Sequence, residues 1–148
     1  GDRKPLGFVE ELLRDLERAR TVVAFGAAFE RRMLAFLAER VPEYAERLNA
    51  VAEGIVDVAL PFQRVWVYHP EQRGSLSLKR AAAALAEVGY EDLELADGGA
   101  ANHLYASAQD SDGVSPELLA HLVDYCSRDT HALAEVVFAL EERAGGRC

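Results

Sequence analysis

The chain has 148 residues, half of them hydrophobic, and a formal net charge of −9 at pH 7. This length suits one core, and no run is long or apolar enough for a transmembrane helix or signal peptide, so we expect a single cytoplasmic domain over residues 1–148. The two cysteines have no spacing typical of a metal site or a disulfide framework. The acidic charge argues against a protein that covers nucleic acid with its own basic surface.

A helix, a strand and a second helix are predicted first. The amphipathic pattern over 8–16 predicts a helix, and the apolar run 21–25 predicts a buried strand. Gly26 ends this strand before a helix that reaches about residue 40. Glu30 then lies in the first helical turn, near the carboxyl end of a strand, where α/β folds collect ligands. The alternative is a glutamate without a function, which the helix dipole favours by roughly 0.3–1 kcal/mol.

The middle of the chain contains a second strand pattern. Residues 42–51 are predicted to be helical, and the apolar run 55–60 predicts another buried strand, ended by Pro61. Asp57 interrupts this run. We favour a structural, hydrogen-bonding role for Asp57 over a place beside a functional site.

An alternating segment follows at 64–70, which is typical of an edge strand or an extended loop. Its Trp66 and Tyr68 have ring faces on which bases could stack, but we expect them to cover the core. Further helices are predicted from Ser77 to Val88 and over 100–108.

Basic residues stand where the helix after Ser77 begins. Lys79 and Arg80, with Arg73 just upstream, are the best candidates for phosphate contacts, because the free N–H groups of a helix start also suit an anion. The simpler alternative is that Ser77 is an ordinary N-cap with exposed basic neighbours.

The last predicted helix runs from about Pro116 to Arg143, and Asp129 falls on its apolar stripe. A carboxylate there needs a cation, a metal ion or several donors, because burying an unpaired charge is costly. Tyr125 lies one turn earlier on the same face. The alternative is an aspartate at the stripe edge that reaches water. The expected stripe consists of Leu119, Leu122, Cys126, Leu133, Val136 and Leu140.

Two short motifs, taken in order, resemble the second and third motifs of the DEDD (DnaQ-like) 3′–5′ exonucleases of the RNase H-like superfamily. The second motif there is roughly N-x-x-F-D after a strand, and here it reads Gly26-Ala27-Ala28-Phe29-Glu30. The third is Y-x-x-x-D on a helix, here Tyr125 to Asp129. Gly26 replaces the usual Asn and Glu30 the usual Asp. The chain is most similar to one uncharacterised bacterial family of that superfamily, which uses F-E and often follows a RecB-like nuclease module.

This likeness covers nearly the whole chain. Its other matching segments are Val41-Pro42-Glu43-Tyr44, Ile55-Val56-Asp57-Val58, Ser77-Leu78-Lys79, Asp97-Gly98, and Cys126 with Thr130. The resemblance implies a helix-rich α/β fold with a small sheet of two or three strands, the second half of an RNase H-like domain. It also implies phosphodiester hydrolysis with two Mg²⁺ or Mn²⁺ ions acting on single-stranded nucleic acid.

The resemblance assigns roles to individual residues. Glu30 and Asp129 would be metal ligands, and Tyr125 would orient the attacking water, so these three are the implied catalytic residues. The implied substrate-binding residues are Phe29, Lys79 and Arg80. A RecB-like nuclease module, fused or separate, would be a partner of the complete protein.

The first motif of the superfamily, D-x-E on an opening strand, is missing before the helix at 8–16. The pattern Asp110-Ser111-Asp112 lies in a polar loop and predicts a turn. We therefore expect a fragment or a degenerate form of the exonuclease domain, with little or no activity by itself. The strand at 21–25 would then lack a neighbour, so we expect self-association by strand pairing or helix exchange, or cover from the N-terminal helix.

Two other functions compete with this interpretation. The chain could be a non-catalytic acidic protein-interaction module, which Gly26 and the missing first motif both favour. It could also be an acidic mimic of DNA, which only the net charge supports.

Overall fold

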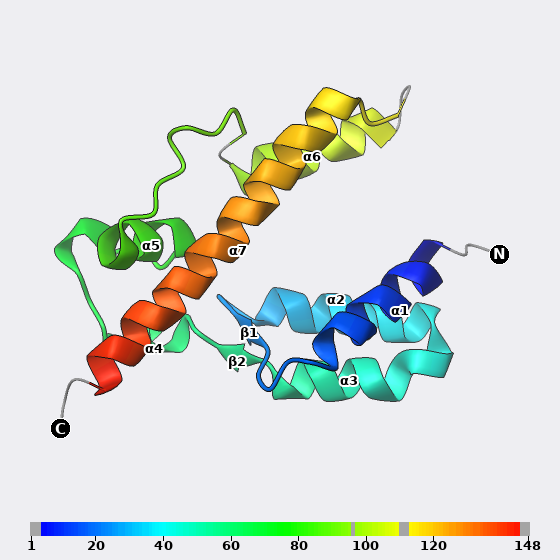
Figure 1. Ribbon diagram of the computed structural model, residues 1–148, viewed down its shortest axis with the longest axis horizontal. Helices are drawn as coiled ribbons and strands as arrows, with labels where there is room; N and C mark the ends of the chain where they lie inside the picture. Colours follow the sequence, from blue (N-terminus) through cyan, green and yellow to red (C-terminus); the bar gives the residue numbers. More distant parts are fainter. Residues whose placement is uncertain (1–3, 96, 110–112, 146–148) are drawn as a thin grey trace. The chain divides into compact units, whose positions relative to one another are not determined.

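The computed structural model describes residues 4–95, 97–109 and 113–145. The chain forms two compact units, unit 1 (Gly1–Val67) and unit 2 (Tyr68–Cys148), which are described separately. Helices dominate both units, and the described residues contain one sheet of two short parallel strands (Figure 1). The chain is therefore a helix-rich α/β protein, as predicted. In the described ranges, no helix is both long and apolar enough to cross a membrane.

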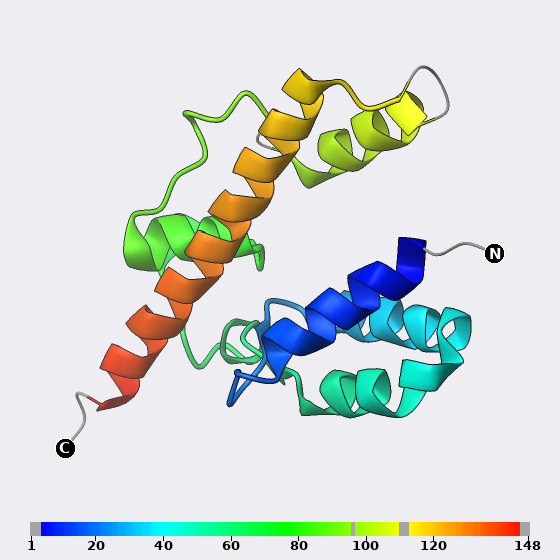
Figure 2. The same ribbon diagram turned by 45° about the vertical axis from the view of Figure 1, so that its right-hand side comes forward.

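Unit 1 is built around a parallel strand pair. Its elements are α1 (Lys4–Leu16), β1 (Val23–Ala24), α2 (Ala28–Arg40), η1 (Pro42–Tyr44), α3 (Ala45–Gly54), β2 (Val56–Asp57) and α4 (Leu60–Gln63). Val23 pairs with Val56 and Ala24 with Asp57, and α2 and α3 form the connection between the strands. The views in Figures 1 and 2 agree that α1 lies beside the antiparallel pair α2 and α3.

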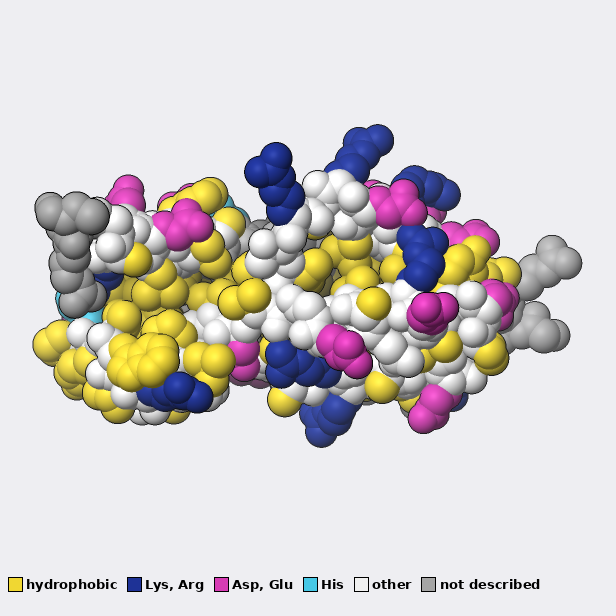
Figure 3. Space-filling model, turned by 90° about the horizontal axis from the view of Figure 1, so that it is seen from below, with side chains coloured by type: hydrophobic (Ala, Val, Ile, Leu, Met, Phe, Trp, Pro, Cys, Tyr) yellow, Lys and Arg dark blue, Asp and Glu magenta, His cyan; other side chains and the backbone are white. Residues whose placement is uncertain are grey.

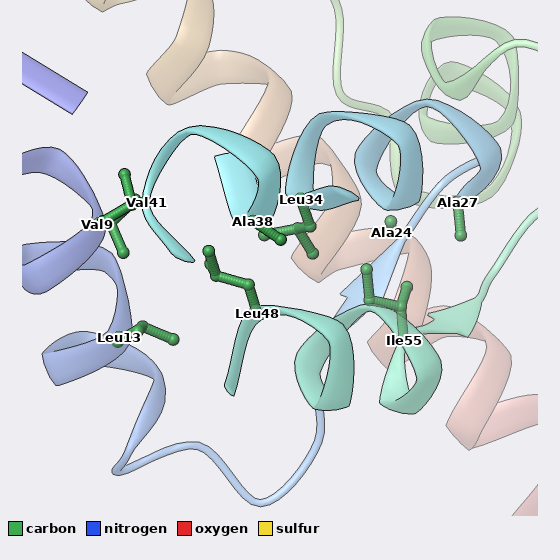
Figure 4. Packing of buried hydrophobic residues seen from close by; sticks show 9 residues of the cluster. All are labelled: Val9, Leu13, Ala24, Ala27, Leu34, Ala38, Val41, Leu48 and Ile55. Carbon is green, nitrogen blue, oxygen red and sulfur yellow. The ribbon is translucent and has the colours of Figure 1, made fainter. Parts of the chain in front are cut away.

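The core of unit 1 joins the three long helices to the strands. Leu13 of α1 points toward Leu48 of α3, and Val9 belongs to the same core, which Ala24 and Ile55 extend to the strands (Figure 4). Leu48 is fully buried. Because burial of one such side chain contributes about 1.5–3 kcal/mol, this continuous cluster is the main source of stability for unit 1. The buried members are Val9, Leu13, Ala24, Ala27, Leu34, Ala38, Val41, Leu48 and Ile55.

Both strands are shorter than the apolar runs 21–25 and 55–60 predicted. Beyond β1, the N–H groups of Gly26 and Ala27 donate to the carboxylate of Asp57 instead of to a strand. Beyond β2, the chain turns directly into α4, with Pro61 in its first turn. Pro61 therefore starts a helix and does not end a strand, a position where its missing N–H costs nothing.

The segment 64–70 was predicted to be an edge strand or extended loop, and its first part is instead a tight turn. The N–H groups of Trp66 and Val67 both donate to the carbonyl of Pro61, at 2.8 and 3.2 Å. Val65 has φ 56°, a left-handed conformation that is unusual for a β-branched residue. Because the backbone folds back on α4, Trp66 and Tyr68 point outward and are 67% and 58% exposed. The expectation that they cover the core was wrong.

Unit 2 consists of η2 (Pro70–Gln72), α5 (Leu78–Ala86), α6 (Gly98–Gln109) and α7 (Pro116–Gly145). α7 packs against α5, which also contacts η2 (Figure 1). Ser77 caps α5 as predicted, but the helix ends at Ala86, because Glu87 adopts the left-handed conformation that terminates helices. The pattern at 110–112 lies outside the described residues.

The buried residues of α5 and α7 are small. Ala81 and Ala82 on α5, and Ala132 and Val136 on α7, are fully buried. The predicted stripe of α7 is wrong at two of the three positions in its first half, because Leu119 is 52% exposed and Cys126 is exposed, whereas Leu122 is half-buried. The face that turns inward instead runs through the half-buried Tyr125 and Asp129.

Candidate functional site

Glu30 lies in the first turn of α2, immediately after the carboxyl end of β1, as predicted. Gly26 makes the turn between them possible, because its φ of 81° is a conformation that glycine adopts without strain. The Oε2 atom of Glu30 is buried and has no hydrogen-bond partner within the described ranges. Burying a carboxylate oxygen without a hydrogen-bond donor costs free energy. This atom is therefore suited to binding a cation or to accepting a hydrogen bond from another molecule.

A cavity of about 260 Å³ opens beside β1 and Glu30. We call it the β1 groove; its walls include Phe8 and Leu12 of α1, Val23 of β1, and Phe29, Glu30 and Met33 of α2. Apart from Glu30, every side chain that lines it is apolar. Phe8, Phe29 and Met33 are 56%, 55% and 42% exposed, so the groove is open to solvent at this side.

Asp57 fixes the backbone around this site. Its carboxylate accepts hydrogen bonds from the N–H groups of Gly26, Ala27 and Ala59, at 2.9, 3.0 and 2.9 Å. Burial by itself would raise the pKa of Asp57, but these three donors and the nearby Arg31 lower it below its usual value. The structural role predicted for Asp57 is confirmed, because its carboxylate fixes the turn that leads from β1 into α2.

Phe29, the implied substrate-binding neighbour of Glu30, projects from the surface. The guanidinium of Arg32 lies 5.9 Å from the centre of its ring. An exposed ring with a cation over one face is chemically able to stack with a nucleic-acid base.

Asp129 and Tyr125, the implied third motif, lie within unit 2 beside a residue that the sequence patterns missed. The hydroxyl of Tyr90 donates to Oδ1 of Asp129 at 2.7 Å. Burial, followed by this hydrogen bond and the charge of Asp129, raises the pKa of Tyr90. The carboxylate on the inward face of α7 therefore accepts a hydrogen bond from a tyrosine hydroxyl, where a cation, a metal ion or several donors were predicted.

Tyr125 is coupled to the same carboxylate. Burial, followed by the charge and hydrogen-bonding of Asp129, raises the pKa of Tyr125 to about 12. Its ring centre lies 6.4 Å from that of Tyr90. A methyl group on Gly98 would approach the Tyr125 hydroxyl to 2.9 Å, so the first residue of α6 packs closely on this tyrosine. Tyr90, Tyr125 and Asp129 thus form one cluster, which we call the Tyr–Asp cluster.

Lys79 joins the Tyr–Asp cluster through its charge. Its Nζ lies 5.0 Å from the ring centre of Tyr90 and 5.2 Å from that of Tyr125. Arg80 is exposed, and its backbone N–H is capped by the Ser77 hydroxyl at 3.4 Å. Of the three predicted phosphate contacts, Lys79 therefore lies beside the predicted catalytic tyrosine. On the face shown in Figure 3, both basic and acidic side chains stand at the surface, with hydrophobic ones between them.

Arg128 ties the segment after α5 to α7. Its guanidinium binds both carboxylate oxygens of Asp92, at 2.8 and 2.7 Å, and also donates to the carbonyl of Gly89. This pairing lowers the pKa of Asp92 and raises that of Arg128. Because Tyr90 lies between Gly89 and Asp92, Arg128 holds the segment that delivers Tyr90 to Asp129.

Two D-x-E patterns occur in the chain, and neither lies on a strand. Asp15 is exposed on α1, and Asp92 is bound by Arg128 in a turn. Within the described part of the chain, no group of three or more His, Cys, Asp or Glu residues could hold a metal ion. Glu30 is in unit 1 and Asp129 in unit 2, so the shared metal site that the resemblance implies for them stays a prediction.

Tyr90 and Arg128 are the residues that sequence reasoning missed. Tyr90 follows Gly89 in a polar segment without periodicity, so no pattern marks it. Arg128 lies inside the Y-x-x-x-D motif, next to Asp129. This position is the one feature of the sequence that could have pointed to its role.

Comparison with known proteins gives one result. The family described as Domain of unknown function (DUF2779) matches residues 2–77, which is just over half of the 148 residues. The match includes Glu30 and Asp57 and ends before Lys79, Tyr125 and Asp129. No curated protein and no solved structure matches the chain significantly. The chain belongs to the DUF2779 family.

Proposed function

We propose that this chain is part of a metal-dependent 3′–5′ exonuclease domain of the DEDDy type, which acts on single-stranded nucleic acid in the cytoplasm. The observation that carries the proposal is Glu30: a carboxylate just beyond a parallel strand, with one enclosed oxygen that has no donor within the described ranges. An RNase H-like fold over the chain as one domain is part of the proposal.

The second support comes from the Tyr–Asp cluster. In a Y-x-x-x-D motif, the tyrosine is useful only if it stays protonated and close to the carboxylate. Tyr125 is protonated at physiological pH, as tyrosines ordinarily are, and its place beside Asp129, which raises its pKa to about 12, suits a hydroxyl that holds a water molecule by a hydrogen bond. Tyr90 fixes one oxygen of Asp129 and orients the carboxylate.

Two Mg²⁺ or Mn²⁺ ions would supply an activated water and stabilise the charge that develops on the phosphate. Glu30 and Asp129 would provide one carboxylate each, and two further carboxylates are needed for a complete ligand set. Lys79 would contact a phosphate, and the exposed ring of Phe29 would stack on a base, while Arg80 would add charge at the surface. A RecB-like module would be a partner in the complete protein.

The test compares this chain with the full product of its gene. We expect the 148-residue chain to show little or no shortening of labelled single-stranded DNA or RNA in Mn²⁺. The full gene product should degrade the substrate from its 3′ end, and Asp129→Asn and Glu30→Gln should each abolish the activity.

Asp124→Asn is the matched control, because Asp124 is exposed on the same helix and lies outside the Tyr–Asp cluster. Absence of metal-dependent cleavage in a folded full-length product would refute the nuclease proposal. Strong activity of the isolated chain that Asp129→Asn removes would refute the claim that half the ligand set is missing.

The second candidate is a non-catalytic, acidic interaction module. The observation that favours it is the β1 groove, an open apolar cavity next to a strand. It predicts a full-length product without cleavage activity, in which Glu30→Gln and Asp129→Asn have no shared phenotype.

A further inference from the structure

The turn after α4 presents the single tryptophan of the chain to solvent. Trp66 is 67% exposed, and the preceding Val65 is 70% exposed. The N–H groups of Trp66 and Val67 both donate to the carbonyl of Pro61, so main-chain hydrogen bonds fix the direction of the chain here. The outward position of the ring is therefore set by the backbone of unit 1.

This turn is also strained. Val65 has φ 56°, and the branched side chain of valine disfavours such a left-handed conformation. The strain brings no burial in return, because Val65 and Trp66 both stay exposed. Residues held in disfavoured conformations gather at ligand-binding sites and active sites. A strained turn that exposes a large aromatic ring therefore points to binding.

A cation lies beside the ring. The guanidinium of Arg64 is 5.1 Å from the centre of the Trp66 ring. Phe29 and Phe36 on α2 have arginines over their rings as well. Those arginines lie three and four residues further along the same helix, a spacing at which helical side chains meet. Arg64 and Trp66 are only two residues apart, so the turn itself brings them together.

The sequence around this turn has a charge opposite to that of the whole chain. Residues 58–86 contain four basic residues and one acidic residue, a charge of +3 in a chain of −9. The basic residues are Arg64, Arg73, Lys79 and Arg80, and the acidic one is Glu71. This charge favours an anionic ligand. An open aromatic ring with an arginine beside it is typical of sites for single strands, in which bases stack on rings and arginines contact phosphates.

We propose that Trp66 stacks on a base of a single-stranded nucleic acid and that Arg64 contacts a neighbouring phosphate. The nature of the ligand rests on the proposed function, but the contact itself needs neither a metal ion nor cleavage. A protein partner is the competing occupant, because tryptophan and arginine also anchor protein interfaces. The positive charge of the segment favours the nucleic acid.

Binding is first measured with this chain and a short oligothymidylate in EDTA, which removes metal ions and so prevents cleavage. Because Trp66 is the single tryptophan, the fluorescence of tryptophan reports on this ring alone. Stacking should quench the emission as the oligonucleotide is added, and the same sugar–phosphate chain without bases should quench it much less. A native chain that does not bind at low salt, or that binds without quenching, would overturn the proposal.

Variants are then compared by the fluorescence anisotropy of a labelled oligothymidylate, with circular dichroism as the check of folding. Trp66→Ala should raise the dissociation constant about tenfold or more, whereas Trp66→Phe keeps a ring and should stay within about threefold of the native value. Arg64→Gln should raise the dissociation constant about threefold. It should also lower the slope of the salt dependence by about 0.7, because one phosphate contact is lost.

Phe36→Ala and Arg40→Gln are the matched controls. Phe36 is 46% exposed on α2, and the guanidinium of Arg40 lies 4.2 Å from the centre of its ring. Both variants should leave the dissociation constant unchanged. A folded Trp66→Ala variant that binds as tightly as the native chain, or controls that lose as much affinity, would refute the proposal.

Two further outcomes separate this proposal from its alternatives. A shift of the native emission to shorter wavelength as the protein concentration rises, without nucleic acid, would show that Trp66 lies in a contact between protein molecules, and would overturn the assignment. Binding that depends on Trp66, together with a full gene product that cleaves nothing, would support this proposal and refute the nuclease proposal alone.

Discussion

Unit 1 and unit 2 each place one candidate carboxylate, but they hold it by different means. In unit 1 the backbone around Glu30 is fixed by Asp57, which binds three main-chain N–H groups across the strand pair. In unit 2, Asp129 is held by side chains, with Tyr90 as donor and Arg128 as the anchor of the Tyr90 segment. The turn that leads to Glu30 is anchored through the backbone, so removing its anchor disturbs the fold of unit 1. A site anchored through side chains can be dismantled one group at a time.

The largest effect is expected from Asp57→Ala. The substitution leaves the N–H groups of Gly26, Ala27 and Ala59 without their acceptor, so the free energy of unfolding should fall by about 2–4 kcal/mol. Urea denaturation followed by circular dichroism measures it. Because the pKa of Asp57 is lowered, its contribution is present above the usual pKa of about 3.9 and is lost as pH falls through its folded value.

The matched control for that variant is Asp92→Ala, which breaks the ion pair between the exposed Asp92 and the half-buried Arg128. Its loss should be much smaller, because Asp92 is open to water and Arg128 keeps the carbonyl of Gly89 as a partner. If the free energy of unfolding falls equally in the two variants, the hydrogen bonds to Asp57 contribute no more to stability than the ion pair of Asp92.

A smaller loss is expected from Tyr90→Phe. The ring stays in place, but Asp129 loses the hydroxyl that donates to it, so the free energy of unfolding should fall by about 1–2 kcal/mol. Tyr68→Phe, on an exposed ring, serves as the control and should change nothing measurable. If both variants behave alike, the Tyr–Asp cluster does not contribute to stability.

The next prediction concerns the pKa of Tyr125, which lies beside Asp129 in unit 2. Its folded pKa of about 12 exceeds the usual value of about 10, so its contribution to stability is complete below pH 10 and is lost as pH rises toward 12. The ultraviolet absorbance of tyrosinate, compared with a Tyr125→Phe variant, isolates this group. Asp129→Asn should lower the pKa of Tyr125 without restoring the usual value, because burial remains. An unchanged pKa would exclude coupling between the two side chains.

The smallest effect is expected from Trp66→Ala. The side chain is 67% exposed, so the free energy of unfolding should change by no more than about 0.5 kcal/mol. As Trp66 is the single tryptophan, the native fluorescence should also show the emission of an indole in water. A loss above about 2 kcal/mol would mean that Trp66 is a core residue after all.

Periodicity predicted the elements whose side chains repeat on one face. The helix at 116–145 follows such a pattern, whereas those at 28–40 and 78–86 were predicted from the glycine and the serine that precede them. The position of Glu30 followed from the strand and the glycine before it. Strand lengths did not follow, because Asp57 takes the N–H groups that would have continued β1 and Pro61 starts a helix. Tertiary hydrogen bonds of this kind leave no periodic signal in the chain.

The candidate site was predictable to the extent that its residues lie in short motifs. Glu30, Tyr125 and Asp129 were found that way, and Lys79 through its place at a helix start. Tyr90 was not, since its contact with Asp129 spans 39 positions and depends on how Arg128 holds an irregular segment. The outward orientation of Trp66 was missed for a related reason: the turn that causes it closes on the carbonyl of Pro61.

The carboxylate of Asp57 also determines how unit 1 opens. β1 and β2 pair over only two residues each, so a single side chain links this short sheet to the first residues that follow both strands. Releasing Asp57 frees the amides of Gly26, Ala27 and Ala59 in one event. In hydrogen–deuterium exchange, these three amides should therefore exchange at a common rate, although 33 positions separate Gly26 from Ala59 in sequence. The strand pair of unit 1 would then open as one cooperative unit, because the Asp57 side chain holds its ends together.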